Sequence, residues 1–416
     1  MRSLLLATPA APADIDGRYA WARLTIAFIL ATIGGAGTWS IVVAMPALTA
    51  EFSVSRSMVA VPYITTMIGF ACGNLLMGRA IDRFGTMGPV ALAVTLHGTG
   101  FLLAAHTASL EMLALWQGIF IGFGSAGTFA PLLADISHWF RRHRGMAVAM
   151  VACGSYMAGA VWPLVMQPLI ESGGWRMAYL AVGAICLVTA LPLTLLLRRK
   201  LPVPLHAAAG EDSGAPPLAT SLSPGQLQAL LVIAGLGCCI AMSMPQVHIV
   251  AYCVDLGHAP ARGAEMLALM LLAGIASRLG SGWLADRIGG VRTLLIGSFG
   301  QFLALCLYIP FDGLASLYMV SMFFGLAQGG IVPSYALIVR EYLPAAEAGR
   351  RVGLVLMMTI IGMAAGAWMG GFIYDLTGSY AAAFLNGIAW NLVNMGAATI
   401  ILLRSAAPER AVASRA

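Results

Sequence analysis

Arg278 lies deep inside an apolar stretch of the chain that runs from Ala264 to Ala285. A cation at such a depth costs about 2.5–3.5 kcal/mol to insert into a bilayer, so it needs a partner. No acidic residue lies at comparable depth in any other apolar stretch of the sequence. The leading candidate for that partner is therefore a carboxylate, or a similar anion, that comes from outside the protein.

The composition is that of a membrane protein. Hydrophobic residues make up 60% of the chain and charged residues 10%, whereas soluble domains have about 25% charged residues. A helix of about 20 apolar residues crosses a bilayer with its backbone groups satisfied. We therefore expect an all-α integral membrane protein whose twelve transmembrane helices form two pseudo-symmetric bundles of six. The expected spans are 22–46, 58–80, 87–106, 110–137, 145–169, 175–197, 226–254, 263–285, 291–310, 314–339, 350–373 and 380–403.

Positive charges indicate the orientation, because Lys and Arg in short loops stay on the cytoplasmic side. With both termini cytoplasmic, only Arg56, Arg176 and Arg262 fall outside and Arg278 within the membrane; the rest of the 23 Lys and Arg are cytoplasmic. We expect a multi-pass protein of the inner (plasma) membrane of a bacterium. The net charge of +6 comes from these scattered anchors and does not indicate nucleic-acid binding.

The chain divides into two halves at a hydrophilic linker rich in Pro, Ala, Gly and Ser. The expected segments are a cytoplasmic tail (1–21), an N-terminal bundle (22–197), the cytoplasmic linker (198–225), a C-terminal bundle (226–403) and a second cytoplasmic tail (404–416).

The two halves also repeat one another. The pattern Gly-x-x-x-Asp-Arg-x-Gly follows the second expected helix at 78–85 and the eighth at 282–289. The same shift along the sequence aligns Asn74 with Arg278. With two six-helix halves and a long central loop, this chain resembles the major facilitator superfamily, whose halves are parallel repeats about an axis normal to the membrane.

Four further segments resemble the bacterial branch of that superfamily that contains monocarboxylate transporters and oxalate/formate antiporters. In that branch an arginine on helix 8 grips the substrate carboxylate, and the resemblance assigns this role to Arg278. The four segments are 39–56, 138–150, 174–180 and 370–384.

The departures from the family also carry information. Animal-type monocarboxylate transporters have an Asp one turn before this arginine and a Lys in helix 1. This chain has Gly274 at the first place and no Lys within 22–46. Oxalate transporters use a second cation in helix 11, and residues 354–371 contain none. One intramembrane charge therefore predicts one substrate carboxylate.

The repeated motif predicts a gate. Gly78 and Gly282 would let neighbouring helices approach closely. The pairs Asp82-Arg83 and Asp286-Arg287 could make cytoplasmic ion pairs that hold one state and break in the other. The alternative is that these charges only fix the orientation in the membrane. Their recurrence in register favours the gate.

His248 is the intramembrane side chain, besides the arginine, that could titrate near neutral pH. It follows Pro245 and Gln246, where a kinked helix could expose it to a central cavity. Three roles stay open for it: a structural hydrogen bond to a neighbouring helix, a substrate contact, and a proton carrier.

Other polar residues of the expected helices either line the substrate site or bond helix to helix, because unpaired polar groups in hydrocarbon are costly. We expect His97 and His106 to serve packing or to face lipid headgroups. The candidates for substrate contact are Thr38, Trp39, Tyr63, Asn74, Thr128, Tyr156, Gln328, Tyr335 and Asn386.

Other functions are excluded or disfavoured by the motifs. The Gly-x-Gly-x-x-Gly pattern at 122–127 lies inside an apolar helix without a preceding strand, so we expect close helix packing there and no dinucleotide. The only Lys, Lys200, follows Arg199 and makes no ATP-binding loop. The seven cysteines lack metal-site spacing. Asp135 stands without an expected partner, so we expect no enzyme, no metal and no cofactor.

The expected function is a monomeric secondary transporter that moves a small organic anion, a monocarboxylate, by alternating access. Coupling to a proton and exchange of anions both stay open. Symport is slightly preferred because one monocarboxylate can cross with a proton without net charge. The alternatives are a carrier for another substrate class and, less favoured, a channel, a sensor or a membrane enzyme.

Overall fold

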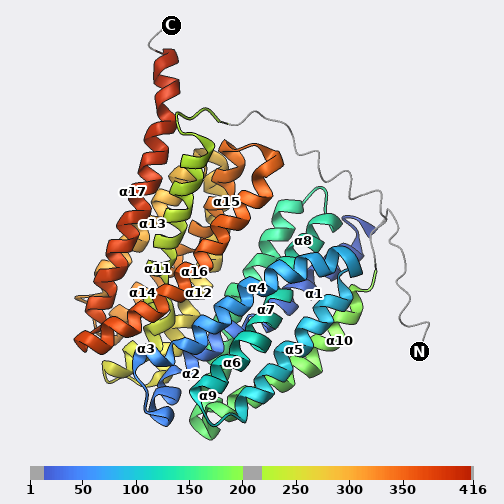
Figure 1. Cartoon of the computed structure of the whole chain (residues 1–416), viewed down its shortest axis with the longest axis vertical. Coiled ribbons are helices and arrows are strands. Elements are labelled where there is room, and N and C mark those ends of the chain that lie inside the picture. Colours follow the sequence, from blue (N-terminus) through green and yellow to red (C-terminus); the bar gives the residue numbers. More distant parts are fainter. Residues whose placement is uncertain (1–13, 200–217, 414–416) are drawn as a thin grey trace. The chain divides into compact units, whose positions relative to one another are not determined.

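The computed structural model describes residues 14–199 and 218–413, and within these ranges the secondary structure is helical without strands. The contacts define two compact units (Figure 1). Of the described residues, 14–54 and 59–199 belong to the first unit, and 55–58 and 218–413 to the second. The remaining residues of the expected linker and of both expected tails lie outside the described ranges.

The first half of the chain is built mainly of long helices, some of them interrupted. They are α1 (Arg18–Gly34), α2 (Ala36–Phe52), α3 (Arg56–Val59), α4 (Val61–Phe84), α5 (Met87–Ala105), α6 (Leu110–Trp116), the π-helical turn η3 (Gln117–Gly122), α7 (Phe123–Gly127), α8 (Ala130–Trp139), α9 (Arg144–Ile185), the π-helical turn η4 (Cys186–Ala190), α10 (Leu191–Thr194) and the 3₁₀ turn η5 (Leu195–Leu197).

The second half repeats this arrangement with fewer interruptions. Its helices are α11 (Pro224–Asp255), α12 (Pro260–Ile288), α13 (Gly290–Tyr308), α14 (Leu314–Gln328), α15 (Ile331–Tyr342), α16 (Ala345–Thr377) and α17 (Tyr380–Ala413).

The described helices make twelve membrane crossings. Eleven helical runs are long and apolar enough to cross a bilayer, and one of them, Arg144–Leu197, has 54 residues. At a rise of 1.5 Å per residue such a run would be about 80 Å long, more than twice the thickness of the bilayer core. It is divided at Gly174, whose φ of 77° is not helical, so it supplies two crossings. The predicted twelve-helix, two-bundle fold is confirmed.

Several helices extend beyond the expected spans. The first begins at Arg18, inside the expected tail 1–21, and α17 continues to Ala413, inside the expected tail 404–416. The apolar pattern marks only the residues in the bilayer core, whereas a helix keeps its backbone bonds on both sides of it.

Glycines allow helices of the first unit to pack closely. A Cβ on Gly122 would lie 2.3 Å from the carbonyl oxygen of Thr66, and one on Gly127 would lie 2.2 Å from the Cβ of Ala93. The Gly-x-Gly-x-x-Gly pattern thus serves helix packing, as predicted.

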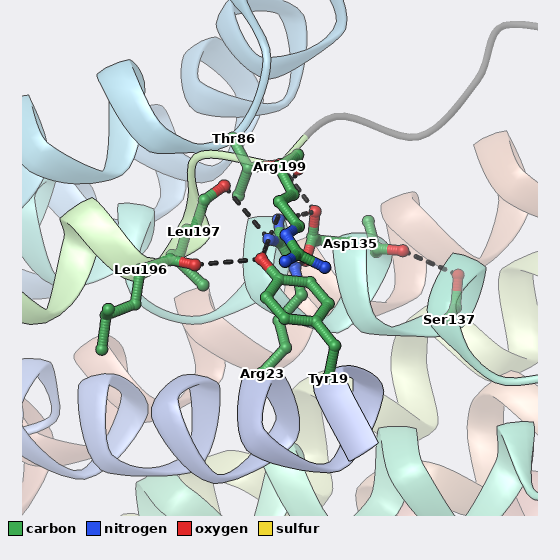
Figure 2. A network of polar contacts seen from close by, with 9 residues as sticks. Tyr19, Arg23, Thr86, Asp135, Ser137, Leu196, Leu197 and Arg199 are labelled. Carbon is green, nitrogen blue, oxygen red and sulfur yellow. Dashed lines mark hydrogen bonds and ion pairs between the residues drawn. The ribbon is translucent and has the colours of Figure 1, made fainter. Parts of the chain in front are cut away.

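A buried ion pair joins α1 to α8 at one end of the first unit (Figure 2). The Nε of Arg23 lies 2.7 Å from one carboxylate oxygen of Asp135, and its Nη2 lies 2.8 Å from the other. The Oγ1 of Thr86, just before α5, donates to the same carboxylate at 2.6 Å. The Nη1 of Arg23 also donates to the carbonyl oxygen of Leu197. This network ties the ends of four membrane crossings together.

The expectation that Asp135 stands without a partner was therefore wrong. Its partner is 112 residues away in the sequence and only the fold brings the two together. Both side chains are almost completely buried, at 1% and 7% exposure. A full ion pair with additional hydrogen bonds offsets the desolvation of both groups.

The repeated motif ends in the same geometry in both units. Gly85 and Gly289 end α4 and α12 with φ values of 78° and 84°, which only glycine adopts readily. After the second copy, the carboxylate of Glu341 accepts the N–H of Gly290 at 3.0 Å. Asp135 binds Thr86 at the corresponding place after the first copy. The sequence repeat is thus a repeat of structure.

We predict that Asp135→Asn lowers the free energy of unfolding of the purified protein by about 3–5 kcal/mol, because it leaves a buried guanidinium without its carboxylate. The matched control is Glu347→Gln, which removes the half-exposed ion pair with Arg351 and should cost about 0–1 kcal/mol. Thermal unfolding in detergent measures both. Equal midpoints for the two variants would contradict a stabilising role of the buried pair.

Candidate functional site

Arg278 lies where α12 packs closely against the end of α14. A Cβ on Gly329 would lie 2.3 Å from the carbonyl oxygen of Gly274 and 2.9 Å from the backbone nitrogen of Arg278, so only glycine fits. The Nε of Arg278 donates to the carbonyl oxygen of Gly329 at 3.5 Å, and the side chain is half-buried. Gly329, directly after α14, therefore lets this backbone approach that of Arg278 closely.

The tenth crossing is interrupted beside Arg278. Helix α14 ends at Gln328 and α15 begins at Ile331, with the buried residues Gly329 and Gly330 between them. The fourth crossing is interrupted in the same way, between the end of α7 and the start of α8 at Ala130. Interrupted helices place backbone groups and helix ends at the middle of the membrane, where carriers of several folds bind substrates.

A pair of buried amides lies at the same interruption. The Nε2 of Gln246, on α11, donates to the Oε1 of Gln328, and the two residues are 4% and 0% exposed. The Nε2 of Gln328 has no hydrogen-bond partner among the described residues. Tyr335 makes a hydrogen bond to another helix. Its hydroxyl donates to the Oδ1 of Asn394, on α17, at 2.9 Å.

His248 is held by two other helices of the second unit. Its Nε2 lies 2.9 Å from the carbonyl oxygen of Ala367, on α16, and must carry the proton because a carbonyl only accepts. Its Nδ1 lies 3.4 Å from the hydroxyl of Tyr380, on α17. A Cβ on Gly370 would lie 2.6 Å from the ring. These contacts favour the structural role among the three that the sequence left open.

The expected contact residues of the first unit have different surroundings. The indole of Trp39 donates to the carbonyl oxygen of Ser155 at 3.3 Å. Thr128 donates to the backbone of its own turn and packs against Gly34. Tyr63 is completely buried, and Thr38 is half-buried. Asn74 is half-buried, and its Oδ1 has no partner among the described residues.

Within each unit, therefore, helix contacts account for Trp39 and Tyr335, and the amide pair at the interruption accounts for the Oε1 of Gln328. The convergence of Thr38, Tyr63 and Asn74 with Arg278 on one ligand stays a prediction.

The glycines of the repeated motif do not act as expected inside the bundles. A Cβ on Gly78 or on Gly282 would meet no described atom within 4 Å. Close helix packing within either unit is thus not the reason for glycine at these two places.

The charges of the motif lie at the surface of each unit. The guanidinium of Arg83 lies 5.3 Å from the ring of Phe84, and that of Arg287 lies 3.7 Å from the ring of Trp283. Asp286 is exposed. No ion pair of these three charged residues is formed with the described part of the chain. The gate that includes Asp82 stays a prediction.

The described residues contain no group of three His, Cys, Asp or Glu that could hold a metal ion. Sequence reasoning overlooked Gln246 as a site residue and Arg23 as a buried cation. A glutamine in the middle of an apolar helix could have indicated Gln246 as a site residue. The sequence could not have indicated that Arg23 is buried, because it lies near the end of its helix, where a charge is ordinary.

Comparison with known proteins gives a consistent result. The model of the Major Facilitator Superfamily matches residues 27–319 and 268–416. Monocarboxylate transporter 13 of Bos taurus is 30% identical over 328 residues, which cover 77% of this chain and 75% of that protein. Monocarboxylate transporter 11 of Homo sapiens is 27% identical over 425 residues, covering 96% and 86% of the two chains.

Two solved structures show the same fold. A mutant of the nucleoside transporter NupG superposes with a TM-score of 0.73 at 15% identity and covers 92% of this chain and 99% of its own. A bacterial homologue of the human lysosomal transporter Spinster, inward-facing and occupied, gives a TM-score of 0.70 at 16% identity, with coverage of 93% and 97%.

Proposed function

Because the chain belongs to the major facilitator superfamily, we propose that it is a secondary transporter of a small monocarboxylate that works by alternating access. The observation that carries the proposal is the half-buried Arg278 on α12, deep in an apolar helix. Relatives that cover most of the chain are named monocarboxylate transporters. These names support the substrate class.

The chemistry of the arginine supports a carboxylate as the ligand. A guanidinium can hold a carboxylate through two parallel hydrogen bonds, whereas a lysine offers a point charge. Residues 354–371 of α16 supply no second cation. A ligand with one carboxylate therefore matches Arg278, to which this segment of α16 adds no second cation.

We predict that Arg278→Lys weakens apparent substrate affinity at least about tenfold, because each hydrogen bond to a charged group contributes about 1.5–3 kcal/mol. Arg278→Ala should abolish transport while the protein still reaches the membrane. The measurement is counterflow of a labelled monocarboxylate in proteoliposomes. Arg262→Ala, which removes an exposed arginine outside the site, is the control. Wild-type counterflow by a well-folded Arg278→Ala variant would remove the proposal.

We also propose that the two halves rock against each other and that Asp82 and Asp286 help to close the cytoplasmic side. We expect Asp82→Asn and Asp286→Asn to favour the inward-open state, because each removes a charge that holds this side closed. Accessibility of single cysteines to membrane-impermeant reagents, applied from each side, measures the shift. Asp312→Asn, at an exposed place between α13 and α14, is the control. Unchanged accessibility would leave the two charges with a role in orientation only.

The structural contacts of His248 predict that it does not carry the coupled proton. A proton carrier must bind its proton with an affinity that changes with bound substrate. We expect His248→Gln to lower the thermal stability, because it loses the bonds to α16 and α17, and to keep the response of uptake to an imposed pH gradient. Loss of that response with intact counterflow would make His248 the carrier. If wild-type uptake ignores the gradient but is accelerated by internal anion, the protein is an exchanger.

A further inference from the structure

The short segment Ser55–Met58, called the strap from here on, comes from the first half of the sequence but belongs to the second unit. The chain leaves the first unit after Val54 and returns to it at Val59. The strap thus lies at the connection between the first two expected crossings, while its contacts are with helices of the second unit. The contacts themselves show what holds it there.

A carboxylate of α16 holds the backbone of the strap. The Oδ1 of Asp375 accepts the N–H of Arg56 at 2.8 Å, and its Oδ2 accepts the N–H of Ser57 at 2.9 Å. Hydrogen bonds to a charged group are stronger than those between neutral groups. Both bonds are lost together if the strap leaves α16, so Asp375 is its anchor.

A glycine of α16 makes room for the same backbone. A Cβ on Gly371 would lie 2.5 Å from the carbonyl oxygen of Arg56 and 2.8 Å from the backbone nitrogen of Ser57. No Cβ approaches backbone atoms that closely, so the strap in this position requires glycine beneath it. The shift that aligns the repeated motif places Gln167 of the first unit opposite Gly371. Only the second half therefore has glycine at this place.

The side chain of Arg56 supplies a positive charge to the end of α11. Its Nη2 lies 2.8 Å from the Oδ1 of Asp255, the last residue of that helix. Its Cζ lies 5.4 Å from the centre of the ring of Tyr374. The side chains of the ion pair are 13% and 22% exposed. Partial burial protects such a pair from screening by salt.

The first unit satisfies the corresponding carboxylate with its own residues. The same shift aligns Glu51 with Asp255. Glu51 pairs with Arg176 and accepts the indole N–H of Trp175 at 2.6 Å. In the second half the place of Arg176 is taken by Tyr380, which has no positive charge to offer. Asp255 takes its cation from the strap instead.

The contacts of the strap are of the kind that can break and form again. They are hydrogen bonds, an ion pair and a cation–π contact. Met58, the large apolar side chain of the strap, is 46% exposed and adds little buried apolar area. Segments with few buried apolar contacts open locally at a low cost in free energy. The strap can therefore leave α16 while the helices stay folded.

We propose that the strap is a releasable latch, which holds one side of the carrier closed while it is docked and leaves its place when that side opens. The charge pattern predicts that this side is the outer one. The inference rests on the proposed function, because a latch has a role only in a carrier that alternates between two states. Order and release of a short segment is one of the established forms of such a switch.

Trypsin tests the docking, because it cleaves after Arg56 only when the strap has left α16. Cleavage of a transiently opened segment follows the population of the open form. We expect Asp375→Ala and Gly371→Ala each to raise the rate of cleavage after Arg56 at least about tenfold over wild type. Mass spectrometry of the digested protein, purified and folded, identifies the fragment that begins at Ser57.

Two variants of the second unit serve as controls for the digestion. Gly353→Ala adds the same methyl group to α16 where a Cβ would meet no described atom within 4 Å. Glu265→Gln removes a carboxylate from another ion pair. Both should be cleaved at the wild-type rate. Cleavage of wild type after Arg56 as fast as that of the denatured protein would overturn the docking even if no variant folds. Unchanged cleavage of the two folded strap variants would do the same.

A reversible cross-link tests the release. In the double variant Arg56→Cys, Asp255→Cys, a bifunctional thiol reagent long enough to replace the two side chains ties the strap to α11. We expect counterflow of labelled propionate in proteoliposomes to be lost on cross-linking and restored by reduction, because a carrier that cannot open one side cannot complete its cycle. Wild type and both single variants, treated with the same reagent, control for the seven native cysteines.

The outcomes separate the latch from the proposed function. Unchanged counterflow in the cross-linked double variant would show that the strap stays docked throughout the cycle. That result would overturn the latch and leave the site of Arg278 untouched. If neither propionate nor another monocarboxylate gives counterflow in wild type, the proposed function fails and the latch fails with it, whereas the digestion still reports whether the strap is docked.

Discussion

A charge or polar group inside a membrane must find a partner, and this constraint governs the structure. Arg23 and Asp135 form a buried ion pair. The carboxylate also accepts a hydrogen bond from the hydroxyl of Thr86, and the guanidinium also donates one to the carbonyl oxygen of Leu197. The arrangement fixes the ends of several crossings of the first unit. Arg278 has another environment, a half-buried place between α12 and the interrupted tenth crossing. The first arginine belongs to the framework, whereas the second has chemistry that suits an external carboxylate.

Internal repetition explains much of the architecture, and its departures locate the chemistry. Gly174 and Gly378, which precede the sixth and twelfth crossings, both have positive φ values, as do Gly85 and Gly289 at the ends of the repeated motif. The fourth and tenth crossings are both interrupted. Against this shared framework, the place that holds Asn74 in one half holds Arg278 in the other. The two halves thus share a framework and differ at this place by an amide in the first and a guanidinium in the second.

The sequence predicted the features that depend on local composition. Apolar stretches revealed the twelve crossings, because the bilayer demands a fixed length of apolar helix. The small residues at 122–127 revealed close packing, because only glycine lets backbones meet there. The repeated motif revealed the two halves. Each of these signals is contained in a short segment.

Features that depend on distant residues could not be predicted in the same way. The partner of Asp135 lies on another helix, and so do the partners of His248, on α16 and α17. Small size alone does not show what a residue faces: a Cβ on Gly78 or Gly282 would meet no described atom within 4 Å, and their part in the gate stays a prediction. Gln328 was among the expected contact residues, but its hydrogen bond with Gln246 could not be expected, because only the fold places the two side chains opposite each other.

The central claim is that Arg278 binds the carboxylate of a small organic acid. Calorimetric titration of the purified protein with propionate and with propionamide, which has the same shape without the charge, tests it directly. We expect wild type to bind propionate and not propionamide, and Arg278→Gln to bind neither. Equal binding of the acid and the amide, or unchanged propionate binding by a folded Arg278→Gln variant, would contradict it.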